Sequence, residues 1–301
     1  MTANNWNATF GTWSRPLSNT EGEKAKRAER LVKDAINAYQ ELSPWSISVF
    51  AQGSYRNGTN VKEDSDVDVT VCCQDLFITH YAFVPGLTDA MTGVTRKPYS
   101  QQMFKNEVGR ALVNFFGGAS VTRGNKIFTV CENTARLTAD VSATFGLRVY
   151  SVDQKGAIFY TPGTHLLTDR MESLWNFPQQ HFEKGQARNG QTALEFKRVV
   201  RVVKRLRNQM EEAGIQEAKP IASYLLESLV YNAPNYSFGL PTYYDRVREV
   251  VAFLYEGLGP GKSGARWLEV NELKMLFHRG QTWTMDQARA FLYAAWQYVG
   301  F

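Results

Sequence analysis

A short run of alternating acidic and valine residues, Asp66-Val67-Asp68-Val69, most constrains how this chain can fold. Side chains two positions apart on a strand point to the same face, so the valines predict a buried face and the aspartates a shared opposite face. Two neighbouring carboxylates repel each other unless a cation lies between them. Magnesium suits this position because it binds hard oxygen ligands and leaves coordination positions for substrate phosphates. The run therefore predicts a strand that carries a magnesium site.

Gly53-Ser54 precedes the acidic run and adds a second kind of ligand. A glycine lets backbone amides approach a phosphate closely, and a serine hydroxyl can hydrogen-bond to one. Each motif alone is common, since Asp-x-Asp occurs on solvated strands and Gly-Ser occurs in ordinary turns. In this order they predict a turn that binds the triphosphate, followed by a metal-binding strand. The combination resembles the signature of the polymerase-β-like nucleotidyltransferases, which continues with a third acid on a neighbouring strand.

Asp140 is the candidate for that third acid, because it lies in a downstream run of small and β-branched residues. The resemblance implies that Asp66, Asp68 and Asp140 are the catalytic residues and bind two Mg²⁺ ions, for which Mn²⁺ can substitute. Asp140 would ligate the metal on the side of the attacking hydroxyl. The alternative is that Asp140 forms a structural ion pair with Arg136 or Arg148. Two weaker candidates for the third acid are Asp75 and Asp153.

The composition of the whole chain narrows the class of protein. At 301 residues, 44% of them hydrophobic, the chain can form one large or two medium domains. Its three cysteines are too few for a disulfide framework, its four histidines lack zinc-ligand spacing, and no window is apolar enough to span a bilayer. The N-terminus lacks the pattern of a signal peptide, so we expect a cytoplasmic protein. A net charge of +5 is compatible with anionic substrates but predicts no basic nucleic-acid tail.

The periodicity of the sequence changes along the chain from mixed to helical. Short strand-like runs alternate with helical patterns in the first half, and from residue 192 onward the pattern is almost entirely helical. The expected helices of the first half are 21–39 and 99–116, and the expected strands are 47–50, 67–72, 127–132, 136–143, 147–152 and 157–160. We therefore expect an α+β fold, with a nucleotidyltransferase core at 1–185 that includes an N-terminal helix and a helical domain at 186–301.

A long helix is expected at 193–212, where apolar residues recur at the helical period. Lys204 lies on its basic stripe, and Ser223 opens the next helical run. A lysine, together with a hydroxyl and free amides at the start of a helix, is a ready ligand set for an anion, so we expect both residues to bind a triphosphate. Tyr224 can stack on a nucleobase or pack in the core. Lys197, on the same stripe, is explained more simply as a solvated residue.

Further motifs make the resemblance more specific. The chain reads Gly-Ser-Tyr-Arg-Asn-Gly-Thr-Asn-Val at 53–61, Asp-Ser-Asp-Val-Asp-Val at 64–69, Arg-Gly-Asn-Lys at 123–126, Asn-Phe-Pro-Gln-Gln-His at 176–181 and Phe-Lys-Arg-Val-Val-Arg at 196–201. Over nearly its whole length it resembles the bacterial CD-NTases, the cGAS/DncV-like nucleotidyltransferases of CBASS antiphage defence, and within them clade E. The resemblance implies a mixed-sheet core of the polymerase-β type joined to a helical domain, with the active site in the cleft between them.

The resemblance also implies a function and its partners. Such an enzyme condenses ribonucleoside triphosphates, here ATP and UTP with GTP or CTP as further options, into a cyclic oligonucleotide second messenger and releases pyrophosphate. Clade E implies a uridine-containing product such as cyclic UMP-AMP or cyclic di-UMP, which acts on a separate CBASS effector. Lys204, Ser223 and Tyr224 fall where the family holds the donor triphosphate and base. Asn189 is matched to a pyrimidine-reading asparagine of clade E, although Asn-Gly is equally typical of a turn.

Two other functions are compatible with these motifs. A terminal transferase that extends RNA has the same fold and chemistry, but the sequence shows no separate RNA-binding domain or strongly basic stripe. A nucleotide-binding or antitoxin module with an inactive site is disfavoured by the three retained acids and by the large helical half. The sequence also lacks the cysteine and histidine cluster of a zinc ribbon, so we expect no activation by DNA through that route.

Overall fold

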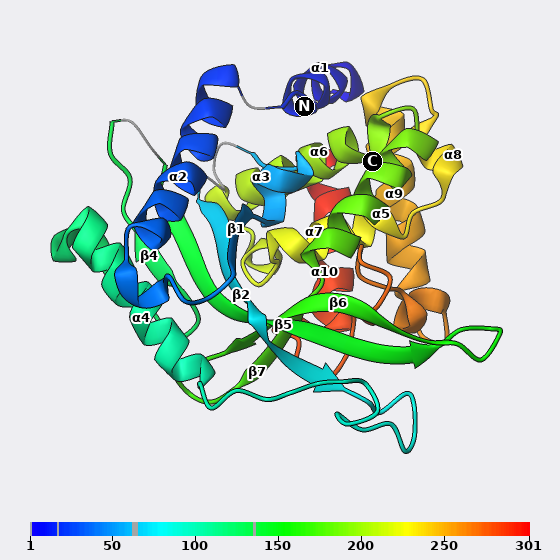
Figure 1. The fold of residues 1–301 in the computed structure, drawn as a ribbon. Coiled ribbons are helices and arrows are strands. Elements are labelled where there is room, and N and C mark those ends of the chain that lie inside the picture. Colours follow the sequence, from blue (N-terminus) through cyan, green and yellow to red (C-terminus); the bar gives the residue numbers. More distant parts are fainter. Residues whose placement is uncertain (1, 17, 62–65, 135–136) are drawn as a thin grey trace. The chain divides into compact units, whose positions relative to one another are not determined.

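The contacts within the chain form two compact units. The structure is a computed structural model that describes residues 2–16, 18–61, 66–134 and 137–301 (Figure 1). One unit, which we call the sheet unit, comprises Asn19–Tyr55 and Ser65–Pro178. The other, which we call the helical unit, comprises Met1–Ser18, Arg56–Asp64 and Gln179–Phe301. Two early stretches of the chain therefore belong to the unit that is formed mainly by the C-terminal helices.

The sheet unit is built on one mixed sheet. Its strands follow the order β1-β2-β5-β4-β3, while β6 pairs with β5 and β7 pairs with β6. β2 and β5 are parallel, and the other strand pairs are antiparallel. The strands are β1 (Ile47–Ala51), β2 (Val67–His80), β3 (Val121–Arg123), β4 (Phe128–Val130), β5 (Ala139–Val152), β6 (Ile158–Leu167) and β7 (Ser173–Asn176). This mixed sheet, followed by a helical C-terminal part, confirms the predicted α+β fold.

Helices α2 (Asn19–Asn37) and α4 (Gln101–Phe116) cover one face of the sheet. Figure 1 shows the two helices side by side, and both contact the central strands. Their apolar stripes pack on the inward side chains of those strands. Members of this shared core include Ala28, Val32, Val67, Val69, Phe104, Val108, Ala139 and Val141. Because side chains alternate along a strand, the other face of β2 and β5 carries their polar residues.

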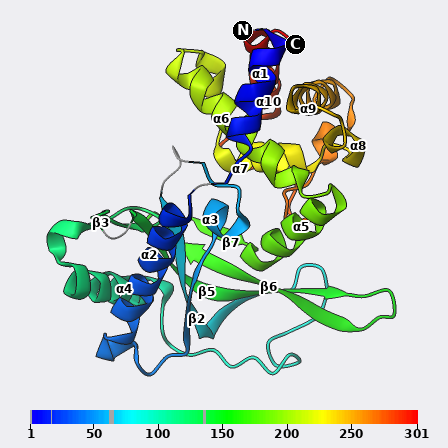
Figure 2. The ribbon, with the colours of Figure 1, turned by 90° about the horizontal axis from the view of Figure 1, so that it is seen from above.

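The helical unit has an apolar core of its own. Its helices include α1 (Ala3–Trp13), α5 (Pro178–Gln191), α6 (Glu195–Glu212), α7 (Ser223–Tyr231), α8 (Asn235–Phe238), α9 (Tyr243–Gly257) and α10 (Met285–Val299) (Figure 2). The predicted apolar stripe of α6 is buried in this core, and it consists of Phe196, Val199, Val200, Val203, Leu206 and Met210. Among the described residues, no helix combines the length and the apolar character that a membrane crossing requires.

Several elements differ from those that the sequence predicts. The sequence did not predict α1, whose asparagines and glycine are poor helix formers, and the helix is stabilised because Trp6 and Phe10 insert into the helical core. The expected strands at 136–143 and 147–152 form one continuous strand, β5. The expected boundary between residues 185 and 186 lies inside α5, whereas the contacts divide the chain before Gln179.

Candidate active site

Two of the predicted catalytic acids lie opposite each other on parallel strands. Asp68 of β2 is in register with Asp140 of β5. The flanking Val69 and Val141 are buried in the core beneath α2 and α4, so the alternation of each strand sends the aspartates to the other face. Asp66 lies just before β2 and is exposed. The pairing of β2 with β5 therefore places the third predicted acid beside the Asp-x-Asp run.

The polar face of these strands carries a ladder of hydrogen-bonding side chains. Thr70 and Ser142 form the next pair on this face, and their hydroxyl oxygens lie 3.2 Å apart. On the other side of β5, Thr129 of β4 is paired with Asp140 and donates a hydrogen bond of 2.8 Å to its Oδ1. Thr129 therefore fixes the orientation of the Asp140 carboxylate through one of its two oxygens.

Gly53 lies directly against the carboxylate of Asp68. It is the first residue of α3 (Gly53–Asn57), and its φ of +65° is a conformation that favours glycine. A Cβ added here would lie 2.1 Å from Oδ2 of Asp68, so a larger residue does not fit while Asp68 keeps its position. The amide of Gln52 donates to the carbonyl of Asp68 at 2.9 Å. The sheet unit thus brings the Gly53-Ser54 turn and the acidic run together, as the sequence predicts.

The donor chemistry of this face fits Mg²⁺. Carboxylate oxygens are its preferred ligands, and Asp68 and Asp140 supply them from adjacent strands, with Asp66 two residues before Asp68. Magnesium usually keeps several waters and takes one or two carboxylates, so a complete protein cage is not required. Over the described ranges, no three acidic, histidine or cysteine side chains are gathered into a preformed cage. Asp66, Asp68 and Asp140 are the residues that would hold the ions.

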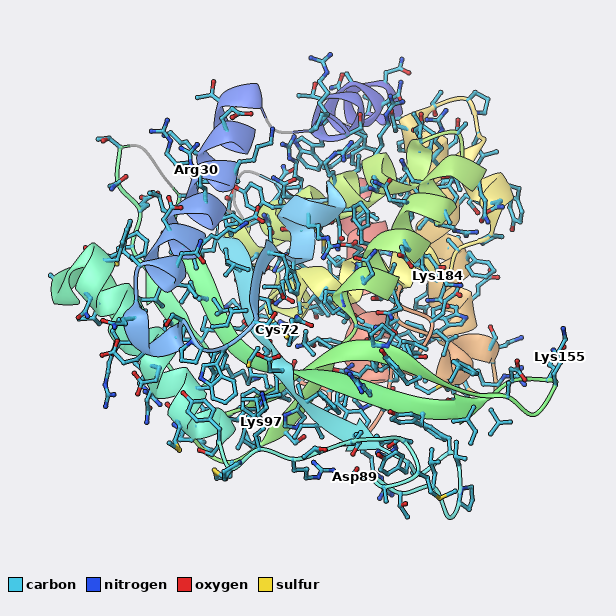
Figure 3. All side chains as sticks on the ribbon, viewed as in Figure 1. Arg30, Cys72, Asp89, Lys97, Lys155 and Lys184 are labelled. Atoms are coloured by element: carbon cyan, nitrogen blue, oxygen red, sulfur yellow. The ribbon has the colours of Figure 1, made fainter. Side chains whose placement is uncertain are left out.

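The two weaker candidates for the third acid bind backbone amides elsewhere in the sheet unit. Asp75 accepts a hydrogen bond of 2.6 Å from the amide of Ser46. Asp153 lies in the turn between β5 and β6, near the outward-pointing Lys155 (Figure 3). Its Oδ1 accepts hydrogen bonds from the amides of Lys155 and Ala157 at 2.8 and 2.9 Å. Both acids therefore stabilise local backbone geometry.

Arg136 and Arg148 are the two arginines that could form a structural ion pair with Asp140. The guanidinium of Arg148 lies over aromatic rings, 3.6 Å from the ring centroid of Phe77 and 5.0 Å from that of Tyr160. Arg136 lies outside the described residues. Within the described part of the chain, Asp140 accepts its hydrogen bond from Thr129 of β4, and no ion pair with Arg148 supports the structural alternative.

In the helical unit, Ser223 is the first residue of α7, as predicted. Its hydroxyl accepts a hydrogen bond of 2.8 Å from Arg207, which also donates to the carbonyl of Ile221 at 3.0 Å. Lys204 has a different partner. Its Nζ is buried and lies 3.4 Å from Oε2 of Glu227. The cation beside Ser223 is therefore Arg207, and the contact of Lys204 with a triphosphate stays a prediction.

Tyr224 is held at its hydroxyl and along its ring. The hydroxyl donates to Oε2 of the buried Glu269 at 2.8 Å. Burial and the charge of Glu269 raise the pKa of Tyr224 well above its usual value, so the hydroxyl stays protonated and keeps donating. The ring centroid lies 5.4 Å from that of His181 and 6.1 Å from that of Trp283, while 36% of the residue is exposed. A ring fixed in this way is suited to stacking, which stays a prediction here.

Asn189 is placed differently from the turn that its sequence allows. It is buried within α5, and the following Gly190 is helical as well, so the Asn-Gly turn alternative is wrong. Its Oδ1 accepts a hydrogen bond of 3.1 Å from the amide of Lys197 near the start of α6. The side chain therefore connects α5 to α6, and its role in reading a base stays a prediction.

Sequence reasoning missed the residues that support the predicted ligands. Thr129 had a usable signal, because its neighbours Phe128 and Val130 are buried and alternation sends Thr129 to the acidic face. Glu227 also had a signal, since it is a lone charge in the apolar run at 225–230. Glu269 had none, because its contact with Tyr224 depends on tertiary structure.

Paired acids on a mixed sheet, with a glycine-serine turn against them, define a nucleotidyltransferase. The family model of the cGAS/DncV-like nucleotidyltransferase C-terminal helical domain matches residues 183–300. The chain is 42% identical to the cyclic dipyrimidine nucleotide synthase CdnE of Legionella pneumophila over 294 residues. The matched region covers 98% of this chain and 98% of the relative. It is 35% identical to the cyclic dipyrimidine nucleotide synthase CdnE of Cecembia lonarensis, over 96% of this chain and 97% of the relative.

Two solved structures agree with these relatives. The Rhodothermus marinus CdnE c-UMP-AMP synthase with Apcpp and Upnpp has a TM-score of 0.83 and 28% sequence identity, over 98% of this chain and 97% of that chain. The Elizabethkingia meningoseptica CdnE cyclic dinucleotide synthase with GTP and Apcpp has a TM-score of 0.79 and 29% identity. This second match covers 98% of this chain and 99% of that chain. The chain belongs to the cGAS/DncV-like nucleotidyltransferases, in the CdnE clade.

Proposed function

We propose that this protein condenses two ribonucleoside triphosphates into a cyclic dinucleotide that contains at least one pyrimidine. The observation that carries the chemistry is the in-register pair of Asp68 and Asp140, with Gly53 against Asp68. The pyrimidine is supported by the relatives from L. pneumophila and C. lonarensis, which are cyclic dipyrimidine nucleotide synthases, and by the c-UMP-AMP synthase of R. marinus. The proposed substrates are therefore UTP together with ATP or a second pyrimidine nucleotide.

The reaction forms one phosphodiester bond at a time. A ribose hydroxyl of one nucleotide attacks the α-phosphorus of the other, the bond from that phosphorus to the bridging oxygen breaks, and pyrophosphate leaves. Asp66, Asp68 and Asp140 would hold two divalent ions, which when bound lower the pKa of the attacking hydroxyl and neutralise charge on the transferring phosphoryl group. Asp140, oriented by Thr129, accepts the proton of the hydroxyl. A second round joins the ends of the linear intermediate.

The proposed nucleotide ligands come from both units. In the sheet unit, Ser54 binds phosphate beside Gly53. In the helical unit, Ser223 supplies a hydroxyl for the triphosphate, and the neighbouring Arg207 supplies positive charge at 2.8 Å from it. Lys204 is a further proposed ligand of the triphosphate, and in this structure its Nζ lies 3.4 Å from Oε2 of Glu227.

The proposed base contacts are both in the helical unit. The exposed part of the Tyr224 ring stacks on a nucleobase, a contact that is tolerant of base identity. Asn189 is the proposed reader of the pyrimidine through its Nδ2, since its Oδ1 already accepts from Lys197. Substitution of Tyr224 would then weaken binding of all nucleotides, whereas substitution of Asn189 would change which nucleotide is used.

The test is to incubate the purified protein with all four ribonucleoside triphosphates and Mg²⁺ and to identify the product by mass spectrometry. We expect a phosphatase-resistant cyclic dinucleotide and pyrophosphate. Asp66→Asn and Asp68→Asn should each lower the rate about a thousandfold, because several kcal/mol of transition-state stabilisation are lost. Asp153→Asn is the matched control, since the Asp153 carboxylate binds the backbone of a turn away from β2, and it should keep the wild-type rate.

Other outcomes would assign other functions. A linear product that forms only with an RNA primer would make the protein a terminal transferase. Nucleotide binding without turnover under every metal and nucleotide condition would make it a binding module. Full activity of Asp68→Asn would contradict the assigned site. The product is expected to act on a separate effector of antiphage defence, which binding of the identified product to candidate effectors would check.

A further inference from the structure

Glu227 is a buried carboxylate that the proposed reaction does not use. It lies on α7 and is 3% exposed. Thr59 donates to its Oε2 at 2.6 Å, Nε2 of His181 lies 2.9 Å from its Oε1, and Nζ of Lys204 lies 3.4 Å from its Oε2. These partners come from the loop after α3, from α5 and from α6. One side chain therefore joins four stretches of the helical unit.

The partners of Glu227 keep it ionised. Burial alone would raise the pKa of Glu227, but the Lys204 ammonium, followed by His181 and Thr59, lowers it well below its usual range. A buried charge is costly unless it is paired and hydrogen-bonded. Removal of any one partner leaves a buried polar group unsatisfied, which costs more than the net value of the bond itself. The network is therefore a strong constraint on the position of Thr59.

The loop that carries Thr59 is embedded in the helical unit. The stretch 57–61 is buried except for Gly58, which is half-buried. A second cation holds the same stretch, because Arg201 of α6 donates to the carbonyl of Gly58 at 2.5 Å and to that of Ser14 at 2.8 Å. Thr59 itself is 0% exposed. Backbone and side-chain bonds thus fix this loop at two consecutive residues.

The chain passes from Ser54 in the sheet unit through this loop and returns to the sheet unit before Asp66. We propose that Glu227 is a positioning residue for nucleotidyl transfer. Through Thr59 it holds the stretch 57–61, which follows the phosphate-binding turn and precedes the metal-binding strand in the sequence. A displacement of the reacting groups by about 1 Å is enough to slow an oriented reaction by about a hundredfold. The inference rests on the proposed function for its kinetic readout only.

The experiment compares Thr59→Val with Thr59→Ser in the full chain. Valine keeps the volume of threonine but removes the donor to Glu227, whereas serine keeps the donor. We expect Thr59→Val to lower kcat about tenfold or more with a smaller change in KM, because reacting groups are misplaced while nucleotide contacts persist. Thr59→Ser should recover most of kcat. Amide hydrogen exchange at 57–61 should accelerate in the valine variant and return towards wild type in the serine variant.

Thr242→Val is the matched control within the helical unit. The hydroxyl of Thr242 accepts from the amide of Asp245 at 3.0 Å and caps α9, so its loss destabilises the same unit without touching the 57–61 loop. This variant should keep the wild-type kcat. Wild-type kcat in Thr59→Val, or unchanged exchange at 57–61, would overturn the inference. If the wild-type protein makes no cyclic product, the proposed function fails, and the exchange comparison still decides the anchoring of the loop.

Discussion

Among the described residues, the hydroxyl of Thr129 orients the carboxylate of Asp140. Thr129 donates to its Oδ1 at 2.8 Å from the paired position of β4. We expect Thr129→Val to lower kcat/KM about tenfold, the value of one hydrogen bond to a charged group, and Thr129→Ser to retain most of it. Binding of Mn²⁺, followed by electron paramagnetic resonance, should weaken in parallel in the valine variant. Thr122→Val on the neighbouring β3 is the control, and an equal loss in that variant would contradict the role of Thr129.

Gly53 is the second residue whose replacement should affect the site directly. An added Cβ would meet the Asp68 carboxylate at 2.1 Å, so Gly53→Ala should displace that carboxylate and remove most activity. Gly86 has a similar positive φ of +84°, but an added Cβ meets nothing within 4 Å. Gly86→Ala should therefore cost about 1 kcal/mol of stability from backbone strain and leave turnover unchanged. Product formation and thermal unfolding measured on both variants check this, and equal activity losses would refute it.

Residues that act through local spacing were predictable, and those that act through distant partners were not. The spacing of Asp66 and Asp68 predicts a common face because strand geometry is local, and the structure places Asp68 on β2 and Asp66 just before it. Asp140 needed the family resemblance, since its pairing with Asp68 joins strands that are far apart in sequence. The burial of Lys204 was unpredictable, because its partner Glu227 is 23 residues away and lies on another helix.

At the level of elements, α1 shows where sequence patterns fail. Its own sequence favours a helix weakly, and tertiary packing of Trp6 and Phe10 determines its conformation. We expect Trp6→Ala to lower the free energy of unfolding by about 3–5 kcal/mol, because the side chain is fully buried. Tyr293→Ala, at an exposed aromatic of α10, is the control and should cost less than about 1 kcal/mol. Denaturant titration measures the free energy of unfolding of both variants. A loss in Trp6→Ala no larger than the loss in Tyr293→Ala would show that α1 is not part of the core.

The longer strands, by contrast, were largely predictable in position, whereas the short β3 and β7 were not predicted. Alternation in β2 indicated both its buried and its polar face, and Val67, Val69 and Val71 lie in the core as expected. The extents were underestimated, because β2 continues to His80 past an irregularity in its pairing with β5 between Cys73 and Phe77. An irregularity of this kind shifts the register of a strand without a strong signal in the sequence.

Across the whole molecule, the three cysteines should differ sharply in reactivity. Cys72, labelled within β2 in Figure 3, and Cys73 are buried, while Cys131 is exposed. Burial raises the pKa of Cys72 to about 11, so its reactive thiolate is scarce at neutral pH. We expect an aromatic disulfide reagent to modify one thiol in the native protein and all three after unfolding. Cys131→Ser should abolish the native reaction, and rapid modification of two thiols in the wild type would contradict the fold of β2.

The division of the chain into units also limits how this protein can change in evolution. The helix that carries Trp6 packs into the core of the C-terminal helices, and the loop that carries Thr59 is hydrogen-bonded to α6 and α7. Because both are encoded far upstream of α5 to α10, the C-terminal helices are not an exchangeable cassette. A recombination event that replaced residues 179–301 alone would leave both upstream pieces facing a foreign surface. Homologous chimeras should therefore succeed only when three separate stretches are inherited together, so base preference in this lineage is expected to diverge by point substitution rather than by domain shuffling.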